Sequence, residues 1–284
     1  MTSLREEQAI ADSISAARAG TVTIGDLTVN RLGLGTNRIN DTDEAHELLQ
    51  EAVALGVNFI DTAHRYQAGA SETAIGNALA PYPGGVVVAT KGGWQDTRPE
   101  QLHGLLEESL RRLQTQCIDL YQLHRVNPEV PIEDSVGALK ALQAEGLINH
   151  IGLSEVTVEQ LQRAQAVAPI VSVQNEYNVA VRKHEDLVDY CTQQGIAFIP
   201  WFPLGGLSGG TAEVEQLVAD VAGKTDATVQ QVALAWLLRR SPVMLPIPGT
   251  LSIEHLKDNL RAASLVLDDE TYQQLLDAPL ARLS

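Results

Sequence analysis

The stretch Val86-Val87-Val88-Ala89-Thr90-Lys91 runs through four apolar residues and ends on a lysine. A continuous apolar run of this kind is typical of a strand in a parallel sheet whose two faces are both covered. Two other mainly apolar runs, residues 57–60 and 118–123, are followed directly by Asp61 and His124. The carboxyl ends of parallel strands meet at one edge of the sheet, where α/β folds build their chemistry. We therefore expect these polar side chains to lie close together.

Strand-like runs recur along the chain with a mean spacing of about 30 residues, the length of one βαβ unit. Eight such runs begin near Leu32, Val57, Val86, Ile118, Ile148, Ile170, Ile196 and Val243. Segments of helical period, such as residues 45–53 and 229–237, lie between them. Gly56, Gly146 and Gly195 stand where a helix gives way to a strand, a position that favours a left-handed glycine. The pattern predicts an α/β fold, a (β/α)8 TIM barrel, with a doubly wound open sheet as the alternative.

Additions to this repeat are also predicted. A hairpin around Gly25 and Asp26, at residues 21–29, precedes the first strand as an N-terminal β-hairpin cap. The long interval between strands 7 and 8 has room for one extra helix at residues 213–221, and a C-terminal helix is expected at residues 270–276. Residues 1–20 are expected to form a peripheral N-terminal arm or helix. Because no linker interrupts the pattern, residues 1–284 are expected to form a single domain.

The composition narrows the class of protein. With 36 acidic and 20 basic residues, the net charge of −16 argues against nucleic acid as a partner. No stretch of about 18 apolar residues and no signal-peptide pattern is present, so we expect no membrane association and a cytoplasmic location. Cys117 and Cys191 lie far apart without a CxxC or histidine-rich context, so no metal site is expected.

Ordered motifs give the chain a resemblance to the aldo-keto reductase superfamily from about Val22 to Leu276. They are Leu32-Gly33-Leu34-Gly35-Thr36, Asn58-Phe59-Ile60-Asp61-Thr62-Ala63 with Tyr66, Val88-Ala89-Thr90-Lys91, Asp119-Leu120-Tyr121-Gln122-Leu123-His124, Ile151-Gly152-Leu153-Ser154, Val173-Gln174-Asn175-Glu176-Tyr177-Asn178, Pro203-Leu204-Gly205 and Pro246-Ile247-Pro248-Gly249-Thr250. The resemblance implies an NAD(P)-dependent oxidoreductase of the CH-OH class whose barrel mouth binds a nicotinamide dinucleotide without a Rossmann domain. It also implies a small carbonyl substrate.

The resemblance assigns roles to four residues. Tyr66 is the general acid that protonates the carbonyl oxygen, and Lys91, held as an ammonium by Asp61, stabilises the developing phenolate. His124 hydrogen-bonds the substrate oxygen and steers it toward Tyr66. Taken singly, Asp61 could be a helix-start carboxylate, Tyr66 a rim aromatic and His124 a core histidine. A lysine that continues a buried strand, however, needs a charged partner.

The match to the family's cofactor-binding residues is less complete than the match to its four catalytic residues. Ser154 and Gln174 match positions that bind the nicotinamide amide, Trp201 matches the aromatic that stacks on its ring, and Glu155 replaces the usual asparagine. Glu155 is expected either inward, where it favours the oxidised ring, or outward on the rim. The expected cofactor residues are Gly35, Thr36, Asp61, Ser154, Glu155, Gln174, Trp201, Phe202, Pro203, Leu204, Gly205, Pro248, Gly249, Thr250, Ser252, His255, Asp258 and Asn259.

The expected cofactor is NADPH (NADP+), with NADH as the alternative. Gly249 and Leu251 offer no cation to a 2′-phosphate. Thr250, Ser252 and His255, at the start of a helix, could still bind this phosphate.

Loops at the mouth are expected to select the substrate. Asn37, Trp94 and Arg125 are the predicted pocket residues, with Arg38 beside them. The resulting prediction is an NADPH-dependent aldehyde reductase that reduces aldehydes and ketones to alcohols, as a monomer or weak homo-oligomer. Two alternatives stay open: a nicotinamide-binding regulatory subunit with little turnover, and a lyase that uses Lys91 as a Schiff base.

Overall fold

Seven parallel strands form a curled sheet at the centre of the computed structural model, which describes residues 14–207 and 211–278. The strands pair in chain order, so each is joined to the next by a crossover. They are β3 (Leu34–Gly35), β4 (Phe59–Asp61), β5 (Val87–Gly92), β6 (Ile118–Leu123), β7 (Ile148–Ser154), β8 (Ser172–Gln174) and β9 (Ala197–Phe198). All their carboxyl ends therefore lie at one end of the sheet, as the sequence repeat predicts.

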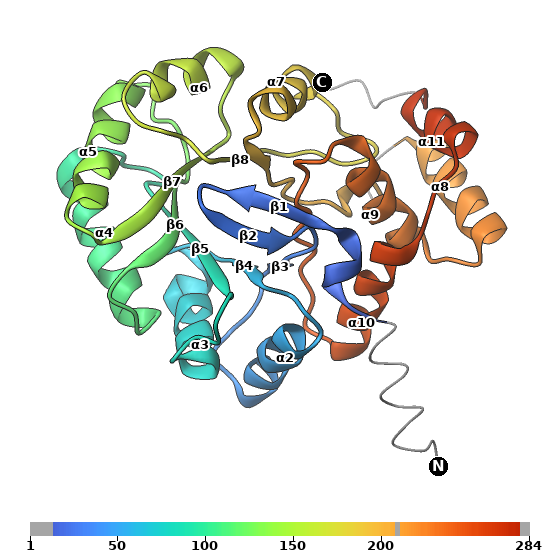
Figure 1. The fold of residues 1–284 in the computed structure, drawn as a ribbon, viewed down its shortest axis with the longest axis horizontal. Coiled ribbons are helices and arrows are strands. Elements are labelled where there is room, and N and C mark those ends of the chain that lie inside the picture. Colours follow the sequence, from blue (N-terminus) through green and yellow to red (C-terminus); the bar gives the residue numbers. More distant parts are fainter. Residues whose placement is uncertain (1–13, 208–210, 279–284) are drawn as a thin grey trace.

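Helices surround this sheet (Figure 1). The α-helices are α2 (Asp43–Ala54), α3 (Ala70–Leu79), α4 (Pro99–Arg112), α5 (Ile132–Ala144), α6 (Val158–Gln165), α7 (Glu185–Gln194), α8 (Ala212–Thr225), α9 (Val229–Arg240), α10 (Ile253–Arg261) and α11 (Asp269–Leu276). Short 3-10 turns are η1 (Ala16–Ala19), η2 (Tyr66–Gly69), η3 (Gly205–Leu207) and η4 (Ala262–Ser264). Helix α8 lies between β9 and α9, in the interval where one extra helix is expected. Within the described residues, no helix is long and apolar enough to cross a membrane.

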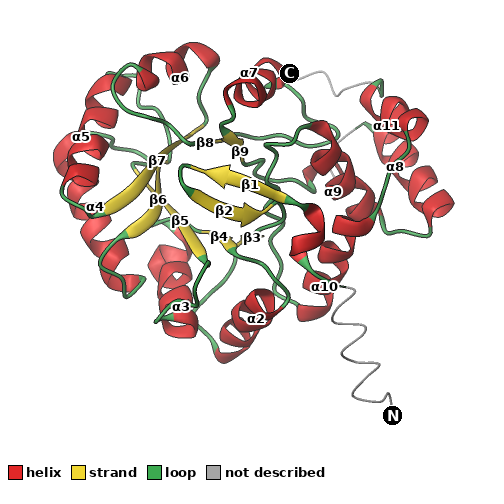
Figure 2. Cartoon of the chain, viewed as in Figure 1, coloured by secondary structure: helices red, strands yellow, loops and turns green. Residues whose placement is uncertain are grey.

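Burial explains the apolar strand runs. All six residues of β5 are buried, and so are five of the six in β6. Helices lie around the outside of the curled sheet (Figure 2), as expected for parallel strands that are buried on both faces. Gly56, Gly146 and Gly195 have positive φ angles of 84°, 77° and 68°, which confirms the predicted left-handed positions.

The structure differs from the prediction at the expected eighth strand. Residues 243–249 make isolated parallel bridges, Phe198 with Met244 on one side and Gly35 with Gly249 on the other. The segment thus lies between β9 and β3, but it forms no regular strand in the described part of the chain. Pro246 and Pro248 explain this, because proline has no N–H to donate to a ladder.

The hairpin lies across the opposite end of the sheet. Strands β1 (Thr21–Ile24) and β2 (Leu27–Asn30) pair antiparallel, and Asp26 in their turn contacts Nε2 of His150, near the start of β7, at 2.7 Å. The hairpin thus covers the amino ends of the strands and leaves the carboxyl ends open. Of the expected N-terminal arm, residues 1–13 lie outside the described part, and residues 16–19 form η1.

Candidate active site

The carboxyl ends of β4, β5 and β6 bring four polar side chains together. Asp61 ends β4, Lys91 is the fifth residue of β5, and His124 directly follows β6. Tyr66 begins η2, a tight turn in which Gln67 and Ala68 adopt positive φ angles of 49° and 53°. Non-glycine residues in this region are strained, and such strain clusters at functional sites. The sequence repeat places these groups at one edge, and the turn brings Tyr66 back over it.

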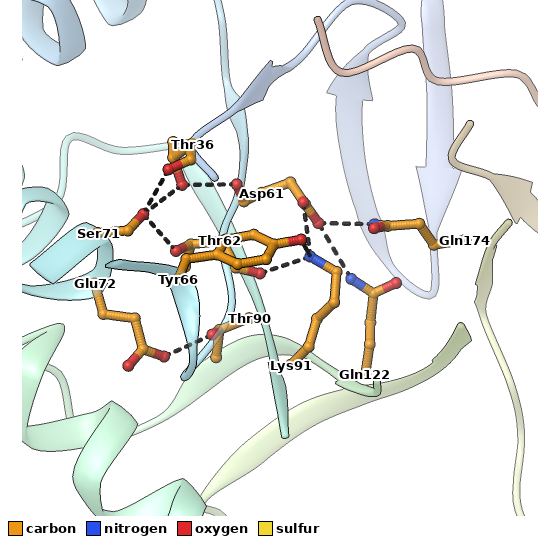
Figure 3. Close-up of polar contacts among 10 residues, drawn as sticks. All are labelled: Thr36, Asp61, Thr62, Tyr66, Ser71, Glu72, Thr90, Lys91, Gln122 and Gln174. Carbon is orange, nitrogen blue, oxygen red and sulfur yellow. Dashed lines mark hydrogen bonds and ion pairs between the residues drawn. The ribbon is translucent and has the colours of Figure 1, made fainter. Parts of the chain in front are cut away.

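The ammonium of Lys91 is the centre of the cluster (Figure 3). Its Nζ donates to Oδ2 of Asp61 at 2.7 Å and to the backbone oxygen of Thr62 at 2.6 Å, and lies 3.5 Å from Oη of Tyr66. The Lys91 side chain is fully buried. Burial alone lowers the pKa of Lys91, but attraction to Asp61 and Tyr66 outweighs it and raises that pKa. Lys91 is therefore a charged ammonium.

Asp61 has hydrogen bonds to both carboxylate oxygens. Oδ2 binds Lys91, and Oδ1 accepts from Nε2 of Gln174 at 2.8 Å and from Nε2 of Gln122 at 3.3 Å. The backbone oxygen of Asp61 accepts from the Thr36 hydroxyl at 2.9 Å. A buried ion pair needs such additional hydrogen bonds to offset its desolvation. The side chain of Asp61 is thus fixed as the counterion of Lys91.

A hydroxyl cluster supports this arrangement from behind. The Ser71 hydroxyl lies 2.8 Å from the hydroxyls of Thr36 and Thr62 and donates to the Thr36 backbone oxygen at 2.9 Å. It ties the ends of β3 and β4 to α3. Thr90 donates to the buried carboxylate of Glu72 at 2.6 Å and ties β5 to the same helix. Ser71 and Glu72 belong to no motif in the sequence, and only their position in the helix after Tyr66 could have indicated them.

His124 is neutral in this environment. Burial, together with the positive charges of Lys91, Arg125 and Arg65, lowers the pKa of His124 to about 2. Its ring lies edge-on to Trp94, with 4.7 Å between ring centroids, and 5.9 Å from that of Tyr66. A neutral imidazole can donate one hydrogen bond to a carbonyl oxygen without giving up its proton.

A cavity of ≈ 510 Å³ opens at this edge of the sheet. Its lining comprises Gly35, Thr36, Asn37, Arg38, Asp61, Arg65, Tyr66, Trp94, His124, Arg125, Ser154, Gln174, Trp201, Phe202, Pro203, Leu204, Ile247, Pro248 and Gly249. A second cavity of ≈ 320 Å³ shares Arg65, Trp94 and His124 with the first and includes Lys91 in its lining. The three predicted pocket residues, Asn37, Trp94 and Arg125, all line the larger cavity. Arg65 and Ile247 were missed, although Arg65 directly precedes Tyr66.

Several expected cofactor residues do not line this cavity. They are Glu155, Gly205, Thr250, Ser252, His255, Asp258 and Asn259. Ser252 caps α10 by accepting from the His255 backbone N–H at 3.4 Å. The Asp258 carboxylate accepts from Gln231 at 2.7 Å and from Thr228 at 3.0 Å, which ties α10 to α9. Ser252 and Asp258 therefore have structural partners already.

Glu155 lies beside the cavity in a left-handed conformation, with φ 56°. Its Oε1 accepts from Nε1 of Trp201 at 2.5 Å and from the Glu176 backbone N–H at 3.0 Å. Its Oε2 pairs with Nη1 of Arg125 at 3.2 Å. Asparagine tolerates this conformation better than glutamate does. Instead of pointing freely inward or outward, the carboxylate joins Trp201 to Arg125.

Comparison with known proteins places the chain in a family. Residues 31–278 match the Aldo/keto reductase family, and the chain belongs to it. It is 42% identical to an uncharacterized oxidoreductase of Schizosaccharomyces pombe, over 94% of this chain and 92% of that protein. It is 38% identical to pyridoxine 4-dehydrogenase of Escherichia coli, over 90% of this chain and 97% of that one.

A solved structure agrees in fold. An aldo/keto reductase from Klebsiella pneumoniae in complex with NADP and acetate superposes with a TM-score of 0.81 at 31% identity, covering 90% of this chain and 93% of that one. The chain is therefore an oxidoreductase of carbonyl compounds, and the similar Klebsiella pneumoniae protein is one whose structure holds NADP.

Proposed function

We propose that the protein reduces aldehydes or ketones to alcohols with NADPH, and that Tyr66 is the general acid. One observation carries the proposal: the Lys91 ammonium lies between Asp61 and Tyr66, 2.7 Å from the carboxylate and 3.5 Å from the phenol oxygen. A cation held there stabilises a phenolate, so Tyr66 can release its proton to a carbonyl oxygen.

The neighbouring residues orient the substrate. His124 is neutral and shares the cavity with Tyr66, so its N–H can hold the carbonyl oxygen while the phenol proton is transferred to it. Asp61 keeps Lys91 charged throughout. In the reverse direction, alcohol oxidation, the Tyr66 phenolate would accept the proton instead.

The opposite wall of the cavity suits a nicotinamide dinucleotide. Ser154 and Gln174 bring a hydroxyl and an amide to it, and Trp201 brings a flat aromatic ring. The Ser154 hydroxyl has no hydrogen-bond partner among residues 14–207 and 211–278, which leaves it free for a carboxamide. When bound there, the cofactor supplies the hydride that reduces the carbonyl carbon. Arg38, whose Nη2 donates to the Gly249 backbone oxygen at 3.0 Å, adds positive charge on this side for phosphates.

The proposal also covers the cofactor preference, the location, the oligomeric state, the domain organisation and one kind of substrate. We propose NADPH over NADH, a cytoplasmic monomer or weak homo-oligomer, and a single domain over residues 1–284. The name of the Escherichia coli relative, pyridoxine 4-dehydrogenase, supports an aromatic aldehyde or alcohol as one substrate.

Turnover of the purified protein tests the proposal. NADPH absorbance is followed with a panel of aromatic and aliphatic aldehydes, with NADH as the comparison. Tyr66→Phe removes the acid but keeps the ring, so kcat should fall by about 10²–10⁴-fold, while NADPH affinity, measured by fluorescence, stays within about twofold. Full activity in Tyr66→Phe would exclude Tyr66 as the acid.

A further inference from the structure

The larger cavity carries a surplus of positive charge. Three arginines line it, Arg38, Arg65 and Arg125, in a chain whose net charge is −16. Asp61 is the one carboxylate lining it among the described residues, and Asp61 is already paired with Lys91. The charge of this cavity is thus opposite to that of the chain as a whole, as expected where a site attracts an anion.

The three arginines differ in their partners. Arg38 donates to the Gly249 backbone oxygen, and Arg125 pairs with Glu155 at 3.2 Å. The guanidinium of Arg65 forms no hydrogen bond or ion pair with any residue in the described ranges. It lies over the ring of Trp94, with 3.9 Å between Cζ and the ring centroid. Arg65 therefore keeps its hydrogen-bond donors free for a ligand.

Arg65 lies on the substrate side of the cavity. It directly precedes Tyr66, and Trp94, which it covers, contacts the His124 ring at 4.7 Å. The Arg125 guanidinium lies over the same ring, 4.7 Å from its centroid. These residues follow β4, β5 and β6, whereas the wall assigned to the cofactor comes from β7, β8 and the segments after β9. An anion bound by Arg65 would thus be near the reacting carbonyl.

Lys91 and His124 cannot replace Arg65 as the group that binds the anion. The charge of Lys91 is taken up by Asp61 at 2.7 Å, and His124 is neutral because burial and the surrounding cations lower its pKa to about 2. Arg65, supported by Arg125, is left to bind a negative group in the bidentate manner typical of guanidinium.

Resting on the reductase function above, we propose that the physiological substrate is an aldehyde or ketone that carries an anionic oxygen group, a carboxylate or a phosphate ester, and that Arg65 binds this group beside Trp94. The carbonyl end then reaches Tyr66 and His124. Arg65 is thereby a specificity-determining residue of the site.

Matched substrate pairs test this proposal. The first pair is 4-carboxybenzaldehyde and its neutral isostere 4-carbamoylbenzaldehyde, and the second is glyceraldehyde 3-phosphate and glyceraldehyde. For the wild type, kcat/KM should favour the anionic member of one pair by about 10- to 100-fold, the range of one charge-assisted hydrogen bond. The pair with the larger ratio identifies the group as carboxylate or phosphate.

Arg65→Met should bring the ratio of kcat/KM between the anionic and the neutral member of the preferred pair close to one, and leave the Kd of NADPH unchanged. Arg111→Met, at an exposed arginine of α4 that lines neither cavity, is the matched control and should behave as the wild type does. Equal kcat/KM for both members of each pair in the wild type would overturn the proposal. So would an equal loss for both members in Arg65→Met, or a weaker affinity for NADPH.

Binding separates this proposal from the reductase function. If no aldehyde is turned over, the reductase proposal fails. Calorimetric titration of the wild type and Arg65→Met, each saturated with NADP+, then still compares the affinities for 4-carboxybenzaldehyde and its amide. Tighter binding of the carboxylate to the wild type alone supports the anion site, and equal binding refutes it.

Discussion

Replacing Lys91 with methionine tests the central electrostatic argument. At the 3.5 Å between Nζ and the Tyr66 oxygen, an effective dielectric constant of about 20 gives an attraction between the ammonium and a phenolate of about 5 kcal/mol. The Asp61 carboxylate and the water around half-buried Tyr66 reduce this attraction to about 3 kcal/mol. Because about 1.4 kcal/mol changes a rate tenfold, Lys91→Met should lower kcat about 100-fold.

The same substitution also affects stability, so the assay needs a second variant. Lys91→Met leaves the buried Asp61 carboxylate uncompensated, at a cost of about 3–5 kcal/mol in the free energy of unfolding. Asp61→Asn in addition removes that charge and should restore much of the stability, measured by urea denaturation. Single-turnover NADPH oxidation, followed by stopped flow, should stay slow in the double variant. The reasoning would be refuted if Lys91→Met kept a rate within threefold of the wild type. It would also be refuted if Lys91→Met combined with Asp61→Asn regained the wild-type rate.

Two further substitutions test other parts of the structure. His124, with its pKa lowered to about 2, binds no proton in the fold between about pH 2 and pH 6.5, whereas in the unfolded chain it becomes protonated as the pH falls through about 6.5. The stability advantage of the wild type over His124→Asn should therefore be complete above pH 6.5 and shrink by up to about 1.4 kcal/mol per pH unit below it. Gly76→Ala in α3 would place a Cβ 2.3 Å from the Arg112 backbone oxygen, so a net loss of about 2 kcal/mol is expected despite the better helix propensity.

Each of these has a control. Denaturation at pH 7 and pH 5 compares the wild type with His124→Asn, and a pH-independent difference would mean that folding does not lower the pKa of His124. Gly104→Ala in α4, where an added Cβ meets nothing within 4 Å, should stabilise by up to about 1 kcal/mol. If both glycine variants gain stability, the close approach of α3 to Arg112 is not as described.

The sequence predicts the strands best where burial alone decides the pattern. The apolar run before Lys91 predicts β5, and the helical period at residues 229–237 predicts α9, because each pattern reports a face that must leave water. The eighth run failed as a strand because Pro246 and Pro248 remove the N–H donors that a ladder needs, although its apolar pattern resembles the others.

In the same way, some features of the site could be predicted from the sequence and others could not. Lys91 requires a buried counterion, so its proximity to Asp61 could be inferred from the chain alone. The direction of Glu155 could not, because it depends on the distant Trp201 and Arg125, which only the folded chain brings beside it. Arg65 was missed for another reason: an arginine in a loop shows its importance only when its lack of a partner is visible.

The hydrogen bonds around Asp61 have a consequence for proton supply. Lys91, Gln122 and Gln174 together occupy both carboxylate oxygens, so this group cannot take up or pass on a proton without losing one of them. In the proposed reaction Tyr66 gives up a proton in every cycle and must regain it before the next. Since Tyr66 is half-buried at the cavity, bulk water at the mouth can reprotonate it directly, and no internal relay through Asp61 is required.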